Sequence, residues 1–227
     1  MLTVPGLCWL CRMPLALSRW GLCSVCQRAT GHRVLLCPRC GLPCAHPTLP
    51  CGRCLQKPPP WQRLIMVNDY TPPLSTLIHQ LKFSRRGEIA PALARLLLLS
   101  VLQARRQSGF IRPDRLISVP LWSRRHWRRG FNQSELLCRP LARWLNCPWD
   151  DRCVTRVRPT APQHHLSARL RKRNLKNAFR LELPVKGLHM VVVDDVVTTG
   201  STVGELAKLL LRNGAATVQV WCLCRTL

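Results

Sequence analysis

Eight of the fourteen cysteines in this 227-residue chain form four Cys-x-x-Cys pairs near its start. The pairs are Cys8/Cys11, Cys23/Cys26, Cys37/Cys40 and Cys51/Cys54. Two cysteines separated by two residues can place both sulfurs on one metal ion, and Zn²⁺ takes four such ligands in a tetrahedron. The spacers of 11 residues (12–22) and 10 residues (41–50) favour two Cys₄ zinc sites, each built from two successive pairs rather than interleaved ones.

Other interpretations of these cysteines remain open. Cys44 is a ninth candidate that could replace one ligand. Disulfides are typical of exported chains, and a redox Cys-x-x-Cys normally occurs in a βαβ pattern. Because Cys₄ coordination leaves no open position, we expect a structural metal on which this core-poor segment depends for folding. Five further cysteines are expected to be ordinary buried thiols: Cys138, Cys147, Cys153, Cys222 and Cys224.

A second stretch with chemistry-bearing residues runs from Val191 to Thr202. An apolar strand delivers Asp194 and Asp195 at its carboxyl end, where α/β sheets bind ligands. A loop of hydroxyls with one glycine follows, and we expect a helix from Val203. The loop consists of Thr198, Thr199, Gly200, Ser201 and Thr202. Backbone N–H groups at a helix start hold a phosphate, and two carboxylates accept hydrogen bonds from a vicinal diol. Ribose 5-phosphate carries both groups.

Two simpler interpretations apply to parts of this stretch. Thr202 and Glu205 fit a capping box, which explains these two residues but not the acidic pair. An acidic strand end is also found beside nucleotide phosphates in P-loop proteins. The chain has no G-x-x-x-x-G-K-[ST] motif to accompany it.

The elements that must position these residues follow an α/β pattern after residue 60. Strands are expected at 64–70, 115–119, 154–157, 189–193 and 216–223, and helices at 74–83, 89–103, 131–145 and 203–211. The final strand–helix–strand is a βαβ unit, so we expect a parallel sheet with flanking helices. The extended run Lys57–Pro60 is a natural linker. It divides the chain into a small Cys-rich zinc-ribbon domain (1–60) and an α/β domain (61–227).

Charge and hydropathy narrow the class of protein. With 35 Lys and Arg against 10 Asp and Glu, the net charge of +25 favours polyanions such as nucleic acid or phosphorylated substrates, against the alternative of a solvated basic surface. The 47% of hydrophobic residues exclude wholesale disorder. The longest apolar run, Leu96–Leu102, is shorter than the ~20 residues of a membrane span, and Cys8 and Arg12 interrupt the region of a signal peptide. We expect a soluble cytoplasmic protein without a transmembrane segment.

The stretch Val191–Thr202 resembles the phosphoribosyl pyrophosphate (PRPP) motif of the type I phosphoribosyltransferases. The resemblance implies that Asp194 and Asp195 contact the ribose hydroxyls and that residues 198–202 hold the 5-phosphate. The order of the remaining motifs resembles the ComF/GntX family over nearly the whole chain. These motifs are the cysteine pairs, Leu81-Lys82-Phe83, Val119-Pro120-Leu121, Arg128-Arg129-Gly130-Phe131-Asn132-Gln133, Thr160-x-x-Gln163-x-x-Leu166, Arg171-x-x-Asn174 and Ala178-Phe179.

The family resemblance implies a protein that assists the uptake or utilisation of external DNA, with single-stranded DNA and DNA-uptake proteins as partners. The phosphoribosyltransferase resemblance also implies a pyrophosphate loop at Val119, Pro120, Leu121 and Trp122. It further implies a mobile catalytic loop with Arg171 and Asn174, and Mg²⁺ bound with PRPP. An active phosphoribosyltransferase with an unknown acceptor is therefore the alternative function. The basic segments around 124–129 and 156–180 suit pyrophosphate and DNA equally, and Trp122, Trp127 and Phe131 could stack on unpaired bases.

Overall fold

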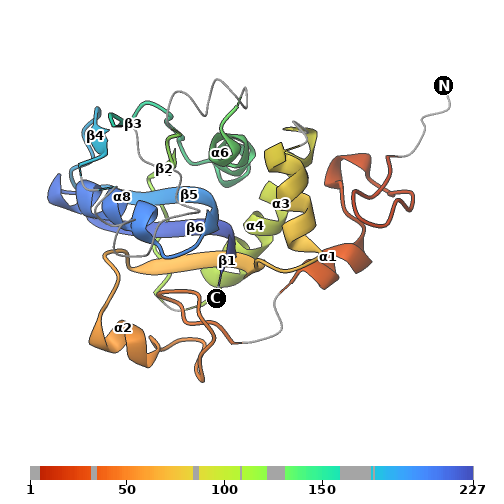
Figure 1. Cartoon of the computed structure of the whole chain (residues 1–227), viewed down its shortest axis with the longest axis horizontal. Coiled ribbons are helices and arrows are strands. Elements are labelled where there is room, and N and C mark those ends of the chain that lie inside the picture. The colour runs from red at the N-terminus through yellow and green to blue at the C-terminus, as the bar shows by residue number, and fades with distance from the viewer. Residues whose placement is uncertain are drawn as a thin grey trace.

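The computed structural model describes residues 6–31, 35–83, 87–107, 109–121, 131–158, 175 and 177–226. At its centre lies a four-stranded sheet in the order β1-β6-β5-β2, in which every neighbouring pair is parallel (Figure 1). The strands are β1 (Arg63–Asp69), β2 (Arg115–Ser118), β5 (His189–Val197) and β6 (Thr217–Arg225). The predicted α/β class with a parallel sheet is confirmed.

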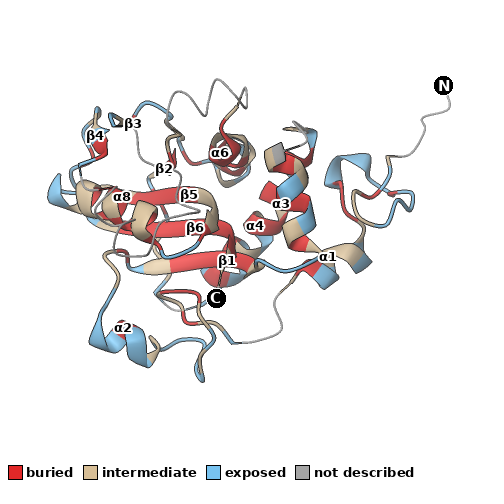
Figure 2. Ribbon diagram, viewed as in Figure 1, coloured by how far each residue is buried: buried red, intermediate tan, exposed pale blue. Residues whose placement is uncertain are grey.

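The strands of the sheet are buried along most of their length (Figure 2), and their buried side chains belong to two cores, one on each face. Side chains along β5 alternate between the two cores: Val191 and Val193 belong to one, and Met190 and Val192 to the other. Strands buried on both faces need apolar residues at consecutive positions, which is why the Val-rich run forms the middle of the sheet.

Helices and a hairpin cover these two faces. The first face packs against α3 (Leu74–Phe83), η2 (Gly87–Ile89), α4 (Ala90–Arg105) and α6 (Gln133–Leu145). The second packs against α8 (Ser201–Arg212) and against the antiparallel hairpin of β3 (Val154–Arg156) and β4 (Phe179–Leu181). The predicted helices are present: α3 has the expected bounds, and the bounds of α4, α6 and α8 differ from the expected ones by at most two residues.

The stretch Gly87–Arg105 is long and apolar enough, by length and composition alone, to cross a membrane. Half of it is buried inside the protein. Leu93, Leu97 and Val101 of α4 are almost completely buried in the core of the first face. The hydropathy of this stretch therefore matches that of a helix packed against a sheet.

The two halves of the Cys-rich segment repeat the same backbone arrangement. Residues 6–15 of the first half correspond to residues 35–44 of the second, at an offset of 29 residues. Leu7 bridges Pro14, and Leu36 bridges Pro43 in the same antiparallel manner. Each turn carries the equivalent backbone hydrogen bonds, Cys8 N–H to Met13 O (2.9 Å) and Cys37 N–H to Leu42 O (2.8 Å). Each half then continues into a short helix that starts directly after a cysteine, α1 (Ser24–Thr30) in the first half and α2 (Gly52–Gln56) in the second. The first half also contains the short helix η1 (Ser18–Trp20).

The two halves contact different parts of the α/β domain (Figure 1). The first half contributes Cys8, Leu15 and Leu22 to the same core as α4. The second half lies against β1, the edge strand of the described sheet, where Pro38 O accepts a hydrogen bond from Leu64 N–H (2.9 Å). The domain boundary near residue 60 remains a prediction. Both halves of the Cys-rich segment contact residues that follow this boundary.

Three local expectations differ from the structure. Strand β5 continues to Val197, so the acidic pair lies within the strand rather than after it. Helix α8 begins at Ser201 with Gly200 as its N-cap, so the capping box at Thr202 and Glu205 is wrong. Strand β4 is not predicted from the sequence, because its pairing with β3 joins residues that are far apart in the chain.

Candidate functional site

A cavity of about 400 Å³ lies where the carboxyl ends of all four sheet strands meet. Its walls include Tyr70 after β1, Val119 after β2, Val197 at the end of β5 and Thr226 after β6. The acidic pair and the loop of residues 198–202, hereafter the hydroxyl loop, line the same cavity. The structure thus brings together the two groups of residues that the sequence assigned to one phosphosugar.

Both carboxylates of the acidic pair are fixed by hydrogen bonds. Asp194 Oδ1 accepts from the Ser134 hydroxyl (3.3 Å) and from the Asp195 N–H (2.9 Å). Asp195 Oδ1 accepts from the Val196 N–H (2.7 Å), and its Oδ2 lies 2.9 Å from Lys82 Nζ. Because each carboxylate has about four acceptor positions, these contacts leave capacity for further donors such as sugar hydroxyls.

The electrostatic balance of the site depends on Lys82. Burial, followed by the neighbouring Asp195 carboxylate, raises the pKa of Asp194 to about 7, while Lys82 acts in the opposite direction. Two adjacent carboxylates within β5 would otherwise repel each other strongly. Lys82 lies in the last turn of α3 and Ser134 in the first turn of α6.

Neither Lys82 nor Ser134 is among the site residues expected from the sequence. Lys82 belongs to the quoted Leu81-Lys82-Phe83 motif, and Ser134 directly follows Asn132-Gln133. Those motifs were the only available signals, and they carry no information about which carboxylate each side chain approaches.

The hydroxyl loop leads directly into the first turn of α8. Gly200, the N-cap residue of α8, has a φ of +74° and lines the cavity. The Thr199 and Ser201 hydroxyls lie 2.8 Å apart. The first N–H groups of a helix have no carbonyl partner within the helix, and together with the helix dipole they attract an anion. The loop therefore has the chemistry of a phosphate site.

The ring of Trp61 packs against Gly200 of the hydroxyl loop. A Cβ atom on Gly200 would lie 2.8 Å from Trp61 Cη2, so only glycine fits there. Trp61 is 4% exposed, and its indole N–H donates to Arg39 O (2.7 Å). Arg225, in the last position of β6, donates to Cys40 O. Three successive carbonyls of one cysteine turn, those of Pro38, Arg39 and Cys40, thus bind groups of the α/β domain.

The residues expected to form a pyrophosphate loop follow β2. Val119, Pro120 and Leu121 line the cavity. The Val119 N–H donates to Val193 O (3.0 Å), and the Val119 carbonyl accepts a hydrogen bond from Asn132 Nδ2 (3.0 Å). Arg156 of β3 also lines the cavity and places a cation there. Trp122, Arg171 and Asn174 lie outside the described residues, as do Arg124–Gly130.

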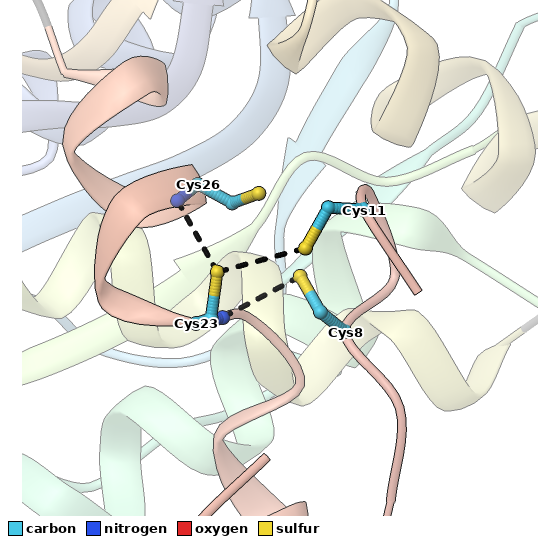
Figure 3. A group of neighbouring side chains, drawn as sticks. All are labelled: Cys8, Cys11, Cys23 and Cys26. Atoms are coloured by element: carbon cyan, nitrogen blue, oxygen red, sulfur yellow. Dashed lines mark hydrogen bonds between the residues drawn. The ribbon is translucent and has the colours of Figure 1, made fainter. Parts of the chain in front are cut away.

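The eight paired cysteines form two groups in chain order. The first cysteine cluster is Cys8, Cys11, Cys23 and Cys26; the second is Cys37, Cys40, Cys51 and Cys54. Within each cluster the sulfurs lie within 4.8 Å of one another, and Figure 3 shows the first. The Sγ–Sγ distances of 3.7 Å (Cys11–Cys23) and 3.6 Å (Cys40–Cys51) match the edge of about 3.8 Å expected for a ZnS₄ tetrahedron with Zn–S bonds of about 2.3 Å.

Equivalent positions in the two clusters have similar electrostatics. Burial alone would raise the thiol pKa values, but backbone N–H donors lower the pKa of Cys8 to about 6 and that of Cys37 to about 7. A thiolate stabilised by backbone donors is the form that coordinates Zn²⁺. Both clusters therefore fit zinc.

Cys44 is not a member of either cluster. Its thiol lies 2.9 Å from His46 O. In the repeat it occupies the position of Leu15, and the two residues make the equivalent backbone bonds, to Leu35 O and Gly6 O. The repeat thus accounts for Cys44 as the counterpart of a core leucine.

Comparisons with known proteins identify the family of the chain. Residues 132–227, which contain α6, the acidic pair and the hydroxyl loop, match the model of the phosphoribosyl transferase domain family. The chain is 81% identical to the "DNA utilization protein YhgH" of Salmonella typhimurium and 78% identical to that of Escherichia coli K12, over the full length of both chains in each case. It is 42% identical to "Competence protein F" of Haemophilus influenzae over 96% of each chain. This chain therefore belongs to the ComF family of competence and DNA-utilisation proteins and carries a phosphoribosyltransferase-type domain.

Proposed function

We propose that this protein supports the utilisation of external DNA and that its main cavity binds the ribose 5-phosphate part of PRPP. The observation that carries the proposal is that the acidic pair and the hydroxyl loop line one cavity at the carboxyl ends of four parallel strands. Asp194 and Asp195 would accept hydrogen bonds from the ribose diol, and the hydroxyl loop would bind the phosphate. The names of the relatives supply the biological context.

Single-stranded DNA is the second ligand of the proposed function. The net charge of +25 supports binding to a polyanion, and the basic segment 124–129 with its aromatic neighbours remains a predicted contact. A cytoplasmic location and contact with DNA-uptake proteins belong to the same proposal. Two structural zinc ions, one in each cysteine cluster, would hold the Cys-rich segment in its observed form.

Calorimetric titration with PRPP, with ribose 5-phosphate and with pyrophosphate alone tests the proposed ligand. We expect PRPP and ribose 5-phosphate to bind to the same site and to compete with each other. Binding of pyrophosphate alone, with no heat from ribose 5-phosphate, would contradict a site built around the sugar.

An active phosphoribosyltransferase is the second candidate function. It is favoured by Val119–Leu121 and Arg156, which line the cavity beside the acidic pair. The positive charge of Arg156 would stabilise a pyrophosphate leaving group, and bound Mg²⁺ would supply further neutralisation of its charge. Arg171 and Asn174 remain predicted loop residues. Pyrophosphate release from PRPP, screened against bases and nucleosides, tests this candidate, and absence of release with every acceptor would count against it.

A further inference from the structure

A second cavity of about 400 Å³ lies on the other side of the hydroxyl loop. Thr199, Gly200 and Ser201 line both cavities. The remaining walls of the second cavity come from Cys40 and Leu42 of the second cysteine turn, from α2 and the segment 57–61 that follows it, from α8 and from the end of β6. One loop therefore serves two cavities that are built from different parts of the chain.

The second cavity is basic. Its described lining includes four cations, Arg53, Lys57, Lys208 and Arg225, and a single acid, Glu205. Glu205 is paired with Lys208 (Nζ–Oε1 2.9 Å). Arg53 and Lys57 are exposed, so their charges face solvent at the rim. Cys40 and Cys54 of the second cysteine cluster also line this cavity and would carry negative charge as zinc ligands, so the part of the lining that attracts phosphate groups is the rim with Arg53 and Lys57.

The main cavity has the opposite charge at the acidic pair. A sugar within a nucleic-acid strand carries a phosphodiester on its 3′ oxygen, and this negative charge would meet Asp194 and Asp195. The sugar at the 3′ end carries a hydroxyl instead, which can donate to these carboxylates. Its 5′ oxygen carries the phosphodiester that links it to the rest of the strand. Only a 3′-terminal nucleotide therefore matches both the acidic pair and the hydroxyl loop.

We propose that the protein binds the free 3′ end of a single-stranded nucleic acid across these two cavities. The terminal sugar lies in the main cavity with its 3′-hydroxyl on the acidic pair, and its 5′ phosphodiester contacts the hydroxyl loop. The preceding phosphates pass over the exposed Thr198–Thr199 edge of the loop into the second cavity, beside Arg53 and Lys57. This inference rests on the proposed binding of ribose 5-phosphate and extends that site to a polymer.

Binding of short oligothymidylates to the full-length protein tests the proposal. The strands end in a 3′-hydroxyl, a 3′-deoxy sugar or a 3′-phosphate, and a circular strand of the same length has no end. We expect the 3′-hydroxyl strand to bind most tightly and ribose 5-phosphate to displace it. A merely basic surface would bind the 3′-phosphorylated strand at least as well as the 3′-hydroxyl strand, because the former carries more charge. That result, or equal binding of the circular strand, would overturn the proposal.

A comparison of strands that end in ribose with strands that end in deoxyribose distinguishes RNA from DNA as the preferred ligand. A terminal ribose offers two hydroxyls to the two carboxylates, whereas a terminal deoxyribose offers one. Tighter binding of a ribose-ended strand would support the proposal with RNA as the preferred ligand. Equal binding of both ends would support it with DNA, the acidic pair then engaging the 3′-hydroxyl alone.

A double variant, Arg53→Ala with Lys57→Ala, tests the second cavity. We expect it to weaken binding of the 3′-hydroxyl strand by roughly tenfold and to lower the salt slope by about 1.4, the value for two lost phosphate contacts on a single strand. Its affinity for ribose 5-phosphate should not change. The matched control is Arg19→Ala with Arg28→Ala, which removes two exposed charges near the first cysteine cluster.

The outcomes separate this inference from the proposed function. If ribose 5-phosphate does not bind to the native protein, the proposed function fails, and this inference fails with it. If ribose 5-phosphate binds but the 3′ end gives no advantage, only this inference fails. Equal strand binding by the double variant and its control would also overturn the assigned path.

Discussion

The ring of Trp61 lies so close to Gly200 that a Cβ atom on Gly200 would be 2.8 Å from Trp61 Cη2. Trp61 is itself held by Arg39 O, a carbonyl inside the Cys37–Cys40 turn. A direct chain of contacts thus joins the second cysteine cluster to the hydroxyl loop.

Substituting Gly200 tests this contact. Gly200→Ala combines a positive φ with a collision against a buried ring, so we expect a loss of roughly 1–2 kcal/mol in the free energy of unfolding and a displaced hydroxyl loop. Ribose 5-phosphate affinity, measured by calorimetry, should fall well below that of the native protein.

The matched control is Gly204→Ala in the same helix. A Cβ there would meet Trp61 at 3.6 Å, an ordinary contact. This variant should keep its ligand affinity and gain up to about 1 kcal/mol from helix propensity. Equal ligand affinities for the two variants would show that the Trp61 contact does not position the loop.

Metal loss should affect the two cysteine clusters differently. Cys23→Ser and Cys51→Ser remove equivalent ligands, since each cysteine directly precedes the helix of its half. We expect each variant to lose zinc, measured by elemental analysis of the purified protein. Only Cys51→Ser should greatly weaken ribose 5-phosphate binding, because the carbonyls of Arg39 and Cys40 accept the hydrogen bonds of Trp61 and Arg225. Similar ligand affinities for both variants at equal zinc loss would contradict this coupling.

The half-buried Asp194 carboxyl, whose pKa is raised in the folded protein, makes the stability of the protein depend on pH. Its pKa is about 7 in the folded protein against 3.8 for the ordinary group, so between these values the folded state holds a proton that the unfolded state has lost. Stability from this group therefore decreases as pH rises from about 4 to 7. We expect Asp194→Asn to raise the melting temperature at pH 8 and to change it less at pH 5. A larger gain at pH 5 would have the wrong sign.

Lys82 should stabilise the acidic pair when both carboxyls are ionised. Lys82→Met leaves two partly buried carboxylates without their cation, and we expect a loss on the order of 1–3 kcal/mol at pH 8 that shrinks at pH 5. Lys208→Met is the control, because its partner Glu205 lies on the same helix and such pairs contribute about 0.5 kcal/mol or less. Chemical denaturation at both pH values gives the comparison.

Much of the fold follows from local sequence patterns. The apolar run 189–193 and the helical spacing after residue 203 correctly place β5 and α8, because a strand buried on both faces and an amphipathic helix have distinctive periodicities. The start of α8 was misplaced, since a positive φ at Gly200 allows the helix to begin before the residues that fit a capping box.

The remaining features depend on contacts between distant residues. Lys82 meets Asp195 across 113 positions of sequence (195 minus 82), and Trp61 meets Gly200 across 139 (200 minus 61). The repeat in the Cys-rich segment is also hidden, because apart from Cys, Leu and Pro its two halves share few residue types. Its common features are backbone hydrogen bonds, which many side chains permit.

The most direct test of the account is the binding of PRPP to the double variant Asp194→Asn with Asp195→Asn. The amides keep the shape of the acidic pair but remove the two carboxylates that accept the ribose hydroxyls. Calorimetric titration, with circular dichroism to verify folding, should show PRPP binding to the native protein and none to the double variant at the same concentrations. Unchanged PRPP affinity in the folded double variant would contradict the assignment of this cavity to the ribose of PRPP.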